Sequence, residues 1–256
     1  AKHFLGDGGT TWGSGEHTEG GHAYKIDRGD TRLTEDEIRQ VHLPPYLKAI
    51  KAGVKTIMIS FNSWNGVQCH GNKFLINDLL KDELGFGGLV VTDWAGIDAI
   101  PGDYKSDVIT SINAGVDLVM VPGSLFGNNH YKTFIQFLKE GVEEGSVPMS
   151  RIDDAVRRIL SVKYDLELFD TPFADPEYAK IFDSDSHRKI ARSAVQKTMV
   201  LLKNEKSVLP LKKDAGITVV GSAANNIGIQ NGGWTVEWQG RMTPDFLILD
   251  KNSDGL

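Results

Sequence analysis

The sequence predicts an α/β protein built around a parallel sheet with crossover helices. Three short apolar runs have the length of buried strands: residues 56–61, 89–92 and 116–121. Each is followed by a segment with helical periodicity: residues 72–84, 107–114 and 130–144. This alternation indicates a parallel sheet, because each helix returns the chain to the start of the next strand. Gly53, Gly88 and Gly115 precede the strands and suit the turns that end helices.

A long amphipathic helix is predicted to begin at Ser150, with Asp153 in the place of a capping-box acid. Its apolar positions form one face: Ile152, Ala155, Val156, Ile159, Leu160 and Val162. The intervening charged positions are Arg151, Asp153, Asp154 and Arg157. Because they match the helix dipole and one another, we expect them to form a solvated face.

The proline-bearing segment 170–176 reads as a connector between domains. It is followed by a predicted helix at residues 186–204 and a predicted strand at residues 217–220. A Gly-Ser loop follows that strand, but it lacks the glycine spacing of a nucleotide-binding loop. We therefore expect a first domain at residues 1–169, a linker at 170–184 and a second domain at 185–256.

Composition narrows the possible functions. The chain has 256 residues, 40% of them hydrophobic and 24% charged, which is typical of a globular protein. A net charge of −6 gives no sign of binding to nucleic acid or to an anionic membrane. The single cysteine, Cys69, excludes a disulfide within the chain. The longest apolar runs fall well short of the ~18 residues that predict a membrane span.

The most informative string is residues 87–94 (GGLVVTDW), an apolar strand that ends in Asp93 and Trp94. In barrels of parallel strands, residues just past the carboxyl ends of the strands line the active site. A carboxylate can attack or stabilise an anomeric carbon, and an indole can pack on the apolar face of a sugar ring. Taken alone, an aspartate in this position is a turn residue or a helix N-cap about as often as it is a functional group.

Further strings occur in a fixed order along the chain: residues 2–10 (KHFLGDGGT), 60–67 (SFNSWNGV), 115–122 (GVDLVMVP), 151–160 (RIDDAVRRIL) and 232–240 (GGWTVEWQG). Together with residues 87–94, they strongly resemble glycoside hydrolase family 3, in its exo-acting β-glucosidase and β-glucan glucohydrolase branch. The resemblance runs from Lys2 to about Gly240. It implies the C-terminal part of a (β/α)8 barrel followed by the beginning of an α/β sandwich domain. It also predicts an internal fragment whose first barrel strands lie upstream.

The resemblance assigns a role to each of several residues. Asp93 matches the catalytic nucleophile, and Lys2 and His3 match a pair that hydrogen-bonds sugar hydroxyls. Phe61 and Met120 match residues that line the sugar pocket. Trp94 and Trp238 match two indoles that clamp a second glucosyl unit, with Trp234 as the alternative to Trp238. On general grounds an isolated aromatic or methionine is more often part of the core.

The implied reaction is retaining hydrolysis of a terminal β-D-glucosyl residue of a β-glucoside or β-glucan, through a covalent intermediate on Asp93. Neither a metal nor an organic cofactor is needed for it. The family's acid/base is a glutamate well after residues 232–240, so the chain by itself is predicted to be inactive. Two alternatives stay open: a non-catalytic carbohydrate-binding fragment, and an assembly subunit.

Three finer properties concern the substrate, the compartment and a segment near the end of the chain. The loop Gly6–Gly9 contains no histidine, whereas the related β-N-acetylglucosaminidases carry one there, which favours a glucosidase. The compartment stays unknown, although secretion or a periplasmic location would suit the family. Residues 250–255 (DKNSDG) resemble half of a calcium loop, but a plain polar turn is the preferred interpretation.

Overall fold

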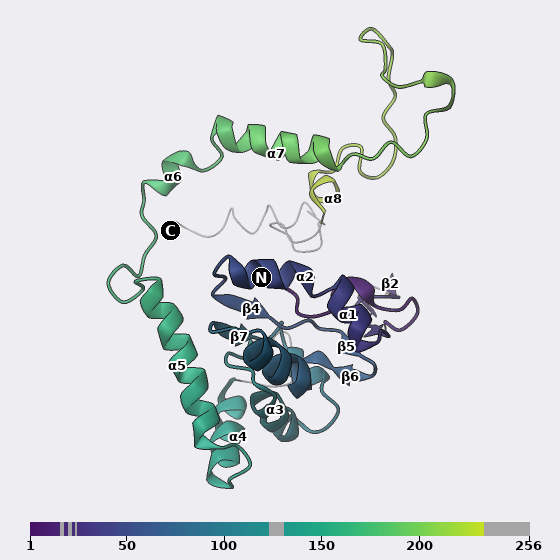
Figure 1. The fold of residues 1–256 in the computed structure, drawn as a ribbon. Coiled ribbons are helices and arrows are strands. Elements are labelled where there is room, and N and C mark those ends of the chain that lie inside the picture. The colour runs from purple at the N-terminus through teal and green to yellow at the C-terminus, as the bar shows by residue number, and fades with distance from the viewer. Residues whose placement is uncertain (16–17, 20–21, 24, 123–130, 233–256) are drawn as a thin grey trace, which may run out of the picture. The chain divides into compact units, whose positions relative to one another are not determined.

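The computed structural model describes residues 1–15, 18–19, 22–23, 25–122 and 131–232 (Figure 1). The chain divides into two compact units, Ala1–Ala179 and Lys180–Leu256. The division predicted from the sequence, with a linker at residues 170–184, stays a prediction. Each unit is described by itself below.

The first unit contains the predicted parallel sheet. Strand β4 (Thr56–Met58) pairs in parallel with β7 (Leu89–Val91), with Thr56 opposite Leu89. Two single bridges extend the arrangement, because Phe4 lies parallel to Ile59 and Leu118 lies parallel to Val91. Four extended segments therefore lie side by side: the amino-terminal residues, β4, β7 and the stretch around Leu118. The predicted strands at residues 56–61 and 89–92 are confirmed in shorter form.

The third predicted strand, residues 116–121, is reduced to the single bridge at Leu118. The reason is the side chain of Asp117. The N–H of Val90 donates to Asp117 Oδ2 at 2.8 Å, while the N–H groups of Asp117 and Leu118 both point to the carbonyl of Val90. The carboxylate thus accepts the hydrogen bond that a backbone carbonyl would accept in a regular ladder.

Helices occupy the three segments where the sequence predicts them. A π-helix, η3 (Phe74–Glu83), follows β4, and α3 (Tyr104–Ala114) follows β7. Helix α3 begins three residues earlier than expected, since the side chain of Asp103 accepts the N–H of Ser106 as an N-cap. Helix α4 covers Tyr131–Glu143, and His130, the predicted first residue, lies outside the described residues.

Several short elements were not predicted. Helices α1 (Glu35–Val41) and α2 (Pro44–Lys51) precede β4. The small strands are β1 (Thr18–Glu19), β2 (His22–Ala23), β3 (Asp30–Thr31), β5 (Ser63–Trp64) and β6 (Val67–Gln68). Asn65 and Gly66 turn the β5–β6 hairpin with φ angles of 50° and 80°. Positive φ at both positions is typical of the tight two-residue turns that join antiparallel strands.

Most of the core lies between the sheet and its helices. Side chains from the amino terminus, β4, β7 and η3 form one buried cluster that includes Phe4, Ile57, Ile59, Leu79 and Val90. Burying a side chain of this size stabilises a fold by roughly 1.5–3 kcal/mol. A second, smaller cluster joins Ile97 and Ile100 to Val108 of α3. Val119 packs against both clusters and so links them.

Helix α5 (Met149–Asp165) differs from the prediction at its start and on its charged face. Its N-cap is Pro148, without a side-chain hydrogen bond, so the expected capping box at Ser150 and Asp153 is wrong. Ser150 already lies inside the helix and therefore cannot cap it. Arg151 and Asp154 were expected to be solvated, but they contact buried groups of the sheet and of η3. Asp153 and Arg157 are exposed, as predicted.

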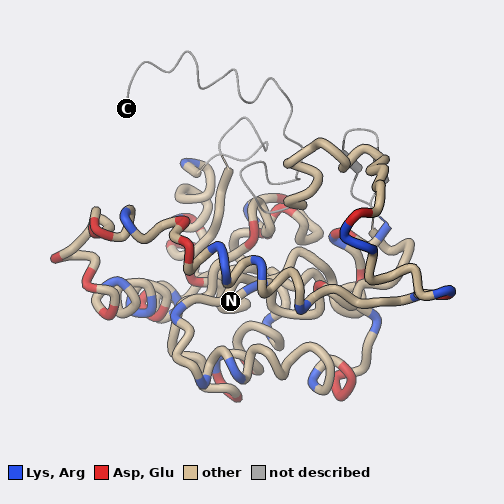
Figure 2. Tube along the Cα trace, turned by 90° about the horizontal axis from the view of Figure 1, so that it is seen from above, with Lys and Arg blue, Asp and Glu red and all other residues tan. Residues whose placement is uncertain are grey.

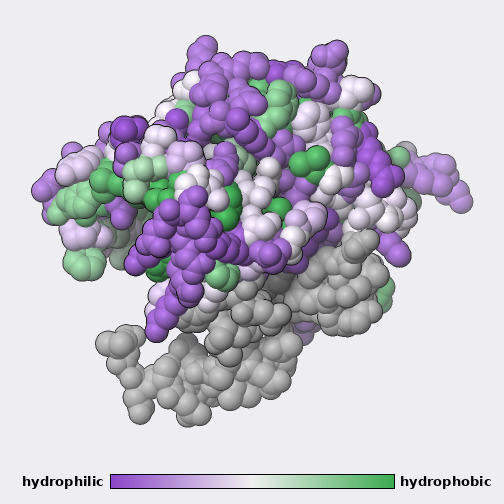
Figure 3. Space-filling view, turned by 90° about the horizontal axis from the view of Figure 1, so that it is seen from below, coloured by the Kyte–Doolittle hydropathy of each residue, from purple (hydrophilic) through white to green (hydrophobic). Residues whose placement is uncertain are grey.

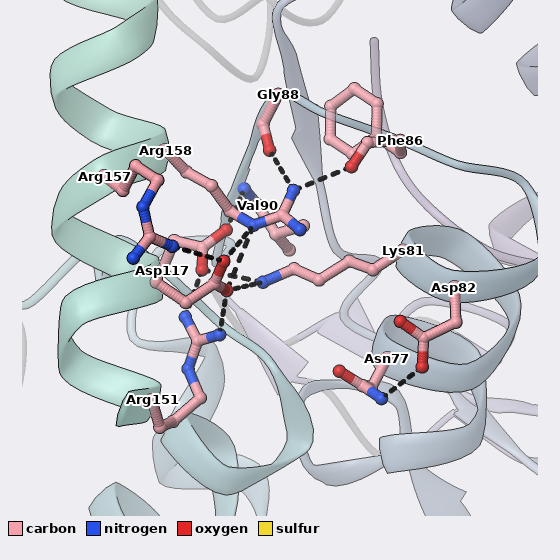
Figure 4. A network of polar contacts seen from close by, with 11 residues as sticks. Asn77, Lys81, Asp82, Phe86, Gly88, Val90, Asp117, Arg151, Arg157 and Arg158 are labelled. Carbon is pink, nitrogen blue, oxygen red and sulfur yellow. Dashed lines mark hydrogen bonds and ion pairs between the residues drawn. The ribbon is translucent and has the colours of Figure 1, made fainter. Parts of the chain in front are cut away.

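These contacts form a network that we call the Asp117 ion cluster (Figure 4). The side chain of Asp117 is fully buried, binds Lys81 Nζ at 2.7 Å and also pairs with Arg151. Asp154 accepts hydrogen bonds from Arg151 at 2.5 Å and from Arg158 at 3.1 Å, and lies 3.6 Å from Lys81. The guanidinium of Arg158 continues to the carbonyls of Phe86 and Gly88. The cluster therefore joins α5, η3 and β7.

The charges of the cluster shift the pKa values of its members. Burial lowers the pKa of Lys81 below its usual value, although the charge of Asp117 opposes that shift. Partial burial alone would raise the pKa of Asp154. The hydrogen bond from Arg151 and the charges of Lys81 and Arg158 outweigh that effect and lower it. Asp154 is thus held in its charged form by Lys81, Arg151 and Arg158.

The second unit, Lys180–Leu256, is described as far as Gly232. Helix α6 (Tyr178–Ile181) lies at the boundary, and α7 (Asp185–Thr198) is shorter than the predicted helix at residues 186–204. Helix α8 spans Ile227–Asn231. The strand predicted at residues 217–220 is wrong, because the described residues offer this segment no neighbouring strand to pair with.

The surface carries both charge signs. Acidic and basic residues lie interspersed along the trace (Figure 2). Small hydrophobic patches lie among hydrophilic side chains on the face shown in Figure 3. Among the described helices, none has the length and apolar character needed to cross a membrane.

The Asp117 ion cluster predicts a specific stability effect. Asp117→Asn keeps the side-chain shape but leaves Lys81 and Arg151 without their buried counter-charge. We expect the free energy of unfolding to fall by about 3–5 kcal/mol, as when one partner of a buried ion pair is removed. Urea unfolding followed by circular dichroism measures this change.

The matched control is Arg157→Ala, at the solvated rim of the same cluster. Its side chain is 68% exposed and lies 3.7 Å from Asp154. We expect a change within about 0.5 kcal/mol, as for most surface substitutions. Equal effects of the two substitutions would contradict the assignment of Asp117 as the central buried charge.

Candidate active site

The candidate site is the turn that follows β7, where Asp93 and Trp94 lie. Thr92, the last residue before it, is buried, and its hydroxyl accepts the N–H of Met120 at 2.8 Å. The N–H of Ala95 donates to the carbonyl of Met120 at 3.1 Å. The chain then enters the short helix η4 (Gly96–Ala99), as the N–H of Gly96 donates to the carbonyl of Asp93. Both ends of the turn are therefore bound to the neighbouring segment at Met120.

The two carboxylate oxygens of Asp93 have different surroundings. Oδ1 accepts the N–H of Trp94 at 2.6 Å. Oδ2 lies 3.8 Å from Nε2 of His3. The side chain is 18% exposed, so the carboxylate is largely sheltered but still reaches solvent. This geometry leaves one oxygen tied to the backbone and the other facing a neighbouring side chain.

The sheet explains how His3 reaches Asp93 from the start of the chain. Phe4 is bound on both sides by β4, since its N–H donates to the carbonyl of Met58 and its carbonyl accepts the N–H of Ser60. His3 is thereby fixed near the carboxyl ends of β4 and β7. Its Nδ1 lies 3.4 Å from Oδ2 of Asp7. The imidazole thus lies between two carboxylates.

Two clefts flank this group of side chains. The first has a volume of about 220 Å³, and its lining includes Lys2, His3, Asp7, His42 and Tyr46. Burial, followed by the charge of Asp7, raises the pKa of Tyr46 well above its usual value, so its phenol stays protonated and can donate a hydrogen bond.

The second cleft has a volume of about 240 Å³ and is lined by Arg28, Phe61, Trp94, Ala95, Asp98 and Ala99. Trp94 is 50% exposed there, so much of its ring is open to a ligand. The guanidinium carbon of Arg28 lies 4.1 Å from the centre of the Phe61 ring, within cation–π range. Two aromatic rings and a cation therefore share this cleft.

Behind the turn lies His70, in the short helix η2 (Cys69–Gly71). It is completely buried, and its Nε2 accepts the backbone N–H of Asp93 at 3.0 Å. The Phe61 ring meets it edge to face, with ring centres 5.8 Å apart. Burial lowers the pKa of His70 to about 3, so its imidazole is neutral at ordinary pH.

The structure brings together most of the residues that the sequence nominates. Asp93 faces His3, Lys2 lines the first cleft with His3, and Trp94 shares the second with Phe61. Met120 is half-buried and contacts the turn through its backbone. Trp238 and its alternative Trp234 lie outside the described residues, as does the calcium-like segment 250–255.

Three residues were missed by reasoning from the sequence. Asp117 could have been found, because a carboxylate within an apolar run at 116–121 must be paired if that run is buried. Arg28 is an ordinary basic residue in a glycine-rich stretch, and nothing in its spacing points to Phe61. His70 carries no local signal either, since its partner is a backbone group 23 residues away.

No cluster of three or more side chains suited to hold a metal ion exists in the part of the chain that the structure describes. The chemistry available at the site is that of carboxylates, imidazole, cations and aromatic rings. Such a set can bind a polyhydroxylated ring by hydrogen bonds and stacking, and can present a carboxylate to it.

Comparison with known proteins identifies the family. The family model described as "Glycosyl hydrolase family 3 N terminal domain" matches residues 1–162. The chain is 34% identical to a lysosomal beta glucosidase of Dictyostelium discoideum over 94% of this chain. It resembles the structure of an exo-1,3/1,4-beta-glucanase from a Pseudoalteromonas species over 95% of its length, with 42% identity and a TM-score of 0.78.

A beta-glucosidase from Listeria innocua, solved in complex with glucose, matches 93% of this chain with 32% identity and a TM-score of 0.72. The chain spans only part of each relative, namely 28% of the Dictyostelium protein, 37% of the Pseudoalteromonas chain and 31% of the Listeria chain. The family model nevertheless covers well over half of the present sequence. The chain therefore belongs to glycosyl hydrolase family 3.

Proposed function

We propose that the protein carrying this chain hydrolyses terminal β-D-glucosyl residues of β-glucosides or β-glucans with retention of configuration. The observation that carries the proposal is the environment of Asp93. One oxygen is held by the N–H of Trp94, and the other faces His3 beside an open cleft. The relatives are named as beta-glucosidases and an exo-beta-glucanase, which supports this substrate class.

In the proposed mechanism, Oδ2 of Asp93 attacks the anomeric carbon, and the bond from that carbon to the leaving oxygen breaks. A second carboxyl group must protonate the leaving oxygen, and then take a proton from the water that releases the sugar from Asp93. The family resemblance assigns that acid/base to a glutamate beyond residues 232–240. The described residues thus supply the nucleophile's half of the mechanism.

Lys2 and His3 are proposed to bind the hydroxyls of the sugar being cleaved. Both line the first cleft, and His3 lies within 4 Å of both Asp7 and Asp93. Hydrogen bonds that strengthen as the ring distorts contribute to transition-state stabilisation in glycosidases. Trp94 and Phe61 are proposed to contact the second sugar, because they share the other cleft.

We further propose that the four parallel segments belong to a (β/α)8 barrel and that residues after the linker begin an α/β sandwich. The order of the segments supports the first part, since each neighbour in space is also the next along the chain. A barrel also places Asp93 where catalytic groups lie, at the carboxyl end of a strand. The catalytic proposal is preferred to a carbohydrate-binding fragment or an assembly subunit, because the matched relatives bear enzyme names.

Asp93→Asn in the complete enzyme should nearly abolish hydrolysis while keeping sugar binding. Asparagine preserves the shape of the side chain but is a far weaker nucleophile, so we expect a rate loss of several powers of ten. The direct measurement is trapping with a 2-fluoro glucoside, followed by peptide mass mapping. A label on any residue other than Asp93 would remove it from the proposed role.

Trp94→Ala should lower kcat/KM for oligosaccharides more than for a simple aryl glucoside, because the indole is proposed to hold the second sugar. A stacking contact of about 1 kcal/mol corresponds to a change of about fivefold. Trp238→Ala should have the same selectivity if the two indoles act together. The measurement is kcat/KM on a laminari-oligosaccharide and on an aryl glucoside.

The control for this prediction is Trp12→Ala, which removes an indole that is 77% exposed and lies outside the lining of both clefts. It should leave the ratio of the two kcat/KM values unchanged. Equal losses on both substrates for Trp94→Ala would count against a contact with the second sugar.

A further inference from the structure

Besides His3, a second histidine contacts Asp93. It is buried, and it faces the backbone of Asp93 rather than its carboxylate. His70 is completely buried, and its Nε2 accepts the N–H of Asp93 at 3.0 Å. Within the described part of the chain, Nδ1 has no hydrogen-bond partner. The bond to Asp93 is thus the one hydrogen bond that this imidazole makes with the described residues.

We propose that His70 is a positioning residue, which fixes the turn Asp93–Gly96 by binding the backbone of Asp93 and so orients the nucleophile. The inference rests on the proposed role of Asp93 as the nucleophile. His70 does not face the cleft and has no contact with substrate in this scheme. It acts through the backbone of Asp93, whose carboxylate then makes the contacts with Trp94 and His3.

Packing on both sides holds the imidazole in place. A Cβ atom on Gly96 would lie 2.3 Å from Nε2 and 2.4 Å from Cε1 of His70, so the ring lies directly against the turn. Phe61 meets the ring from another side, with an interplanar angle of 72°. Because Phe61 also lines the cleft with Trp94, His70 lies between the backbone of the nucleophile and a wall of that cleft.

The chemistry of imidazole fits this task. A neutral imidazole has one nitrogen that donates and one that accepts, and here Nε2 accepts, so Nδ1 carries the proton. Burial keeps the ring neutral, with its pKa lowered to about 3. A protonated ring would present an N–H to the N–H of Asp93. A neutral acceptor also adds no positive charge beside the carboxylate.

The hydrogen bond limits how the nucleophile can move. With the N–H of Asp93 bound to His70 and Oδ1 bound to the N–H of Trp94, the side chain has little freedom to rotate. Oδ2 is then left on the side of His3. Displacing a reacting group by about 1 Å can cost up to about 100-fold in rate. We therefore expect loss of the acceptor to slow formation of the glycosyl-enzyme more than it weakens binding.

The test compares His70→Leu, which removes the acceptor, with His70→Gln, whose amide oxygen can reach the position of Nε2. In the complete enzyme, the rate of labelling of Asp93 by a 2-fluoro glucoside should fall about 10- to 100-fold in His70→Leu. It should be largely restored in His70→Gln, and KM for an aryl glucoside should change little in either. The control is His187→Leu, an exposed histidine of α7, which should label at the wild-type rate.

Two results of the labelling experiment would overturn the proposal. One is a wild-type rate in His70→Leu, and the other is an equal loss in His70→Gln and His70→Leu. If the wild type itself is labelled elsewhere than at Asp93, the proposed function fails. Labelling at Asp93 that does not respond to His70 would remove only the present inference.

A second measurement keeps the inference testable if His70→Leu does not fold. Nitrogen NMR of the wild-type protein, with its histidine ring nitrogens isotopically labelled, reports which ring nitrogen carries the proton. The signals of His70 are identified by their loss in His70→Gln. We expect the Nδ1–H tautomer. An Nε2–H tautomer would make the hydrogen bond from Asp93 impossible and would overturn the proposal.

Discussion

A carboxylate buried inside the sheet is the constraint on which the rest of the first unit depends. The side chain of Asp117 accepts the N–H of Val90 in place of a backbone carbonyl, and its negative charge is balanced by Lys81 and Arg151. A buried charge of this kind is strongly unfavourable unless it is paired and hydrogen-bonded. The sheet, η3 and α5 must therefore be assembled together for the carboxylate to be tolerated. The hydrophobic core supplies the driving force, and the Asp117 ion cluster selects which faces meet.

The consequence reaches the candidate site through β7. One end of this strand is tied to the cluster, because Arg158 binds the carbonyls of Phe86 and Gly88 and Asp117 binds Val90. At the other end the chain leaves the sheet at Asp93. Three further contacts fix the turn there: Met120 from the neighbouring segment, His70 from below and His3 from the first extended segment. The proposed nucleophile, Asp93, thus lies in a turn that follows a strand held at both ends.

Periodicity predicted the alternating strands and helices and the location of Asp93 after a strand, and the family resemblance predicted that His3 belongs to the same site. Those features depend on local patterns that a short string can carry. The errors share a different cause. The shortened strand at residues 116–121 and the buried contacts of α5 were both decided by contacts between segments distant in sequence. The hydrogen bond between His70 and Asp93, which the sequence did not predict, is of the same kind. Local propensity is silent about such contacts, whereas a charged residue within an apolar run was a signal that could have been used for Asp117.

The left-handed backbone at Ala95, with φ of 54°, affects how this turn could be engineered. An alanine in this conformation is strained by about 1–2 kcal/mol relative to glycine. Alanine in exchange narrows the range of shapes open to the turn, whereas glycine would widen it. A designer seeking heat resistance would find Ala95→Gly an attractive relief of strain. The same change would loosen the loop between Trp94 and Gly96, so a gain in thermal tolerance here would come with a less well-ordered turn at the proposed sugar site.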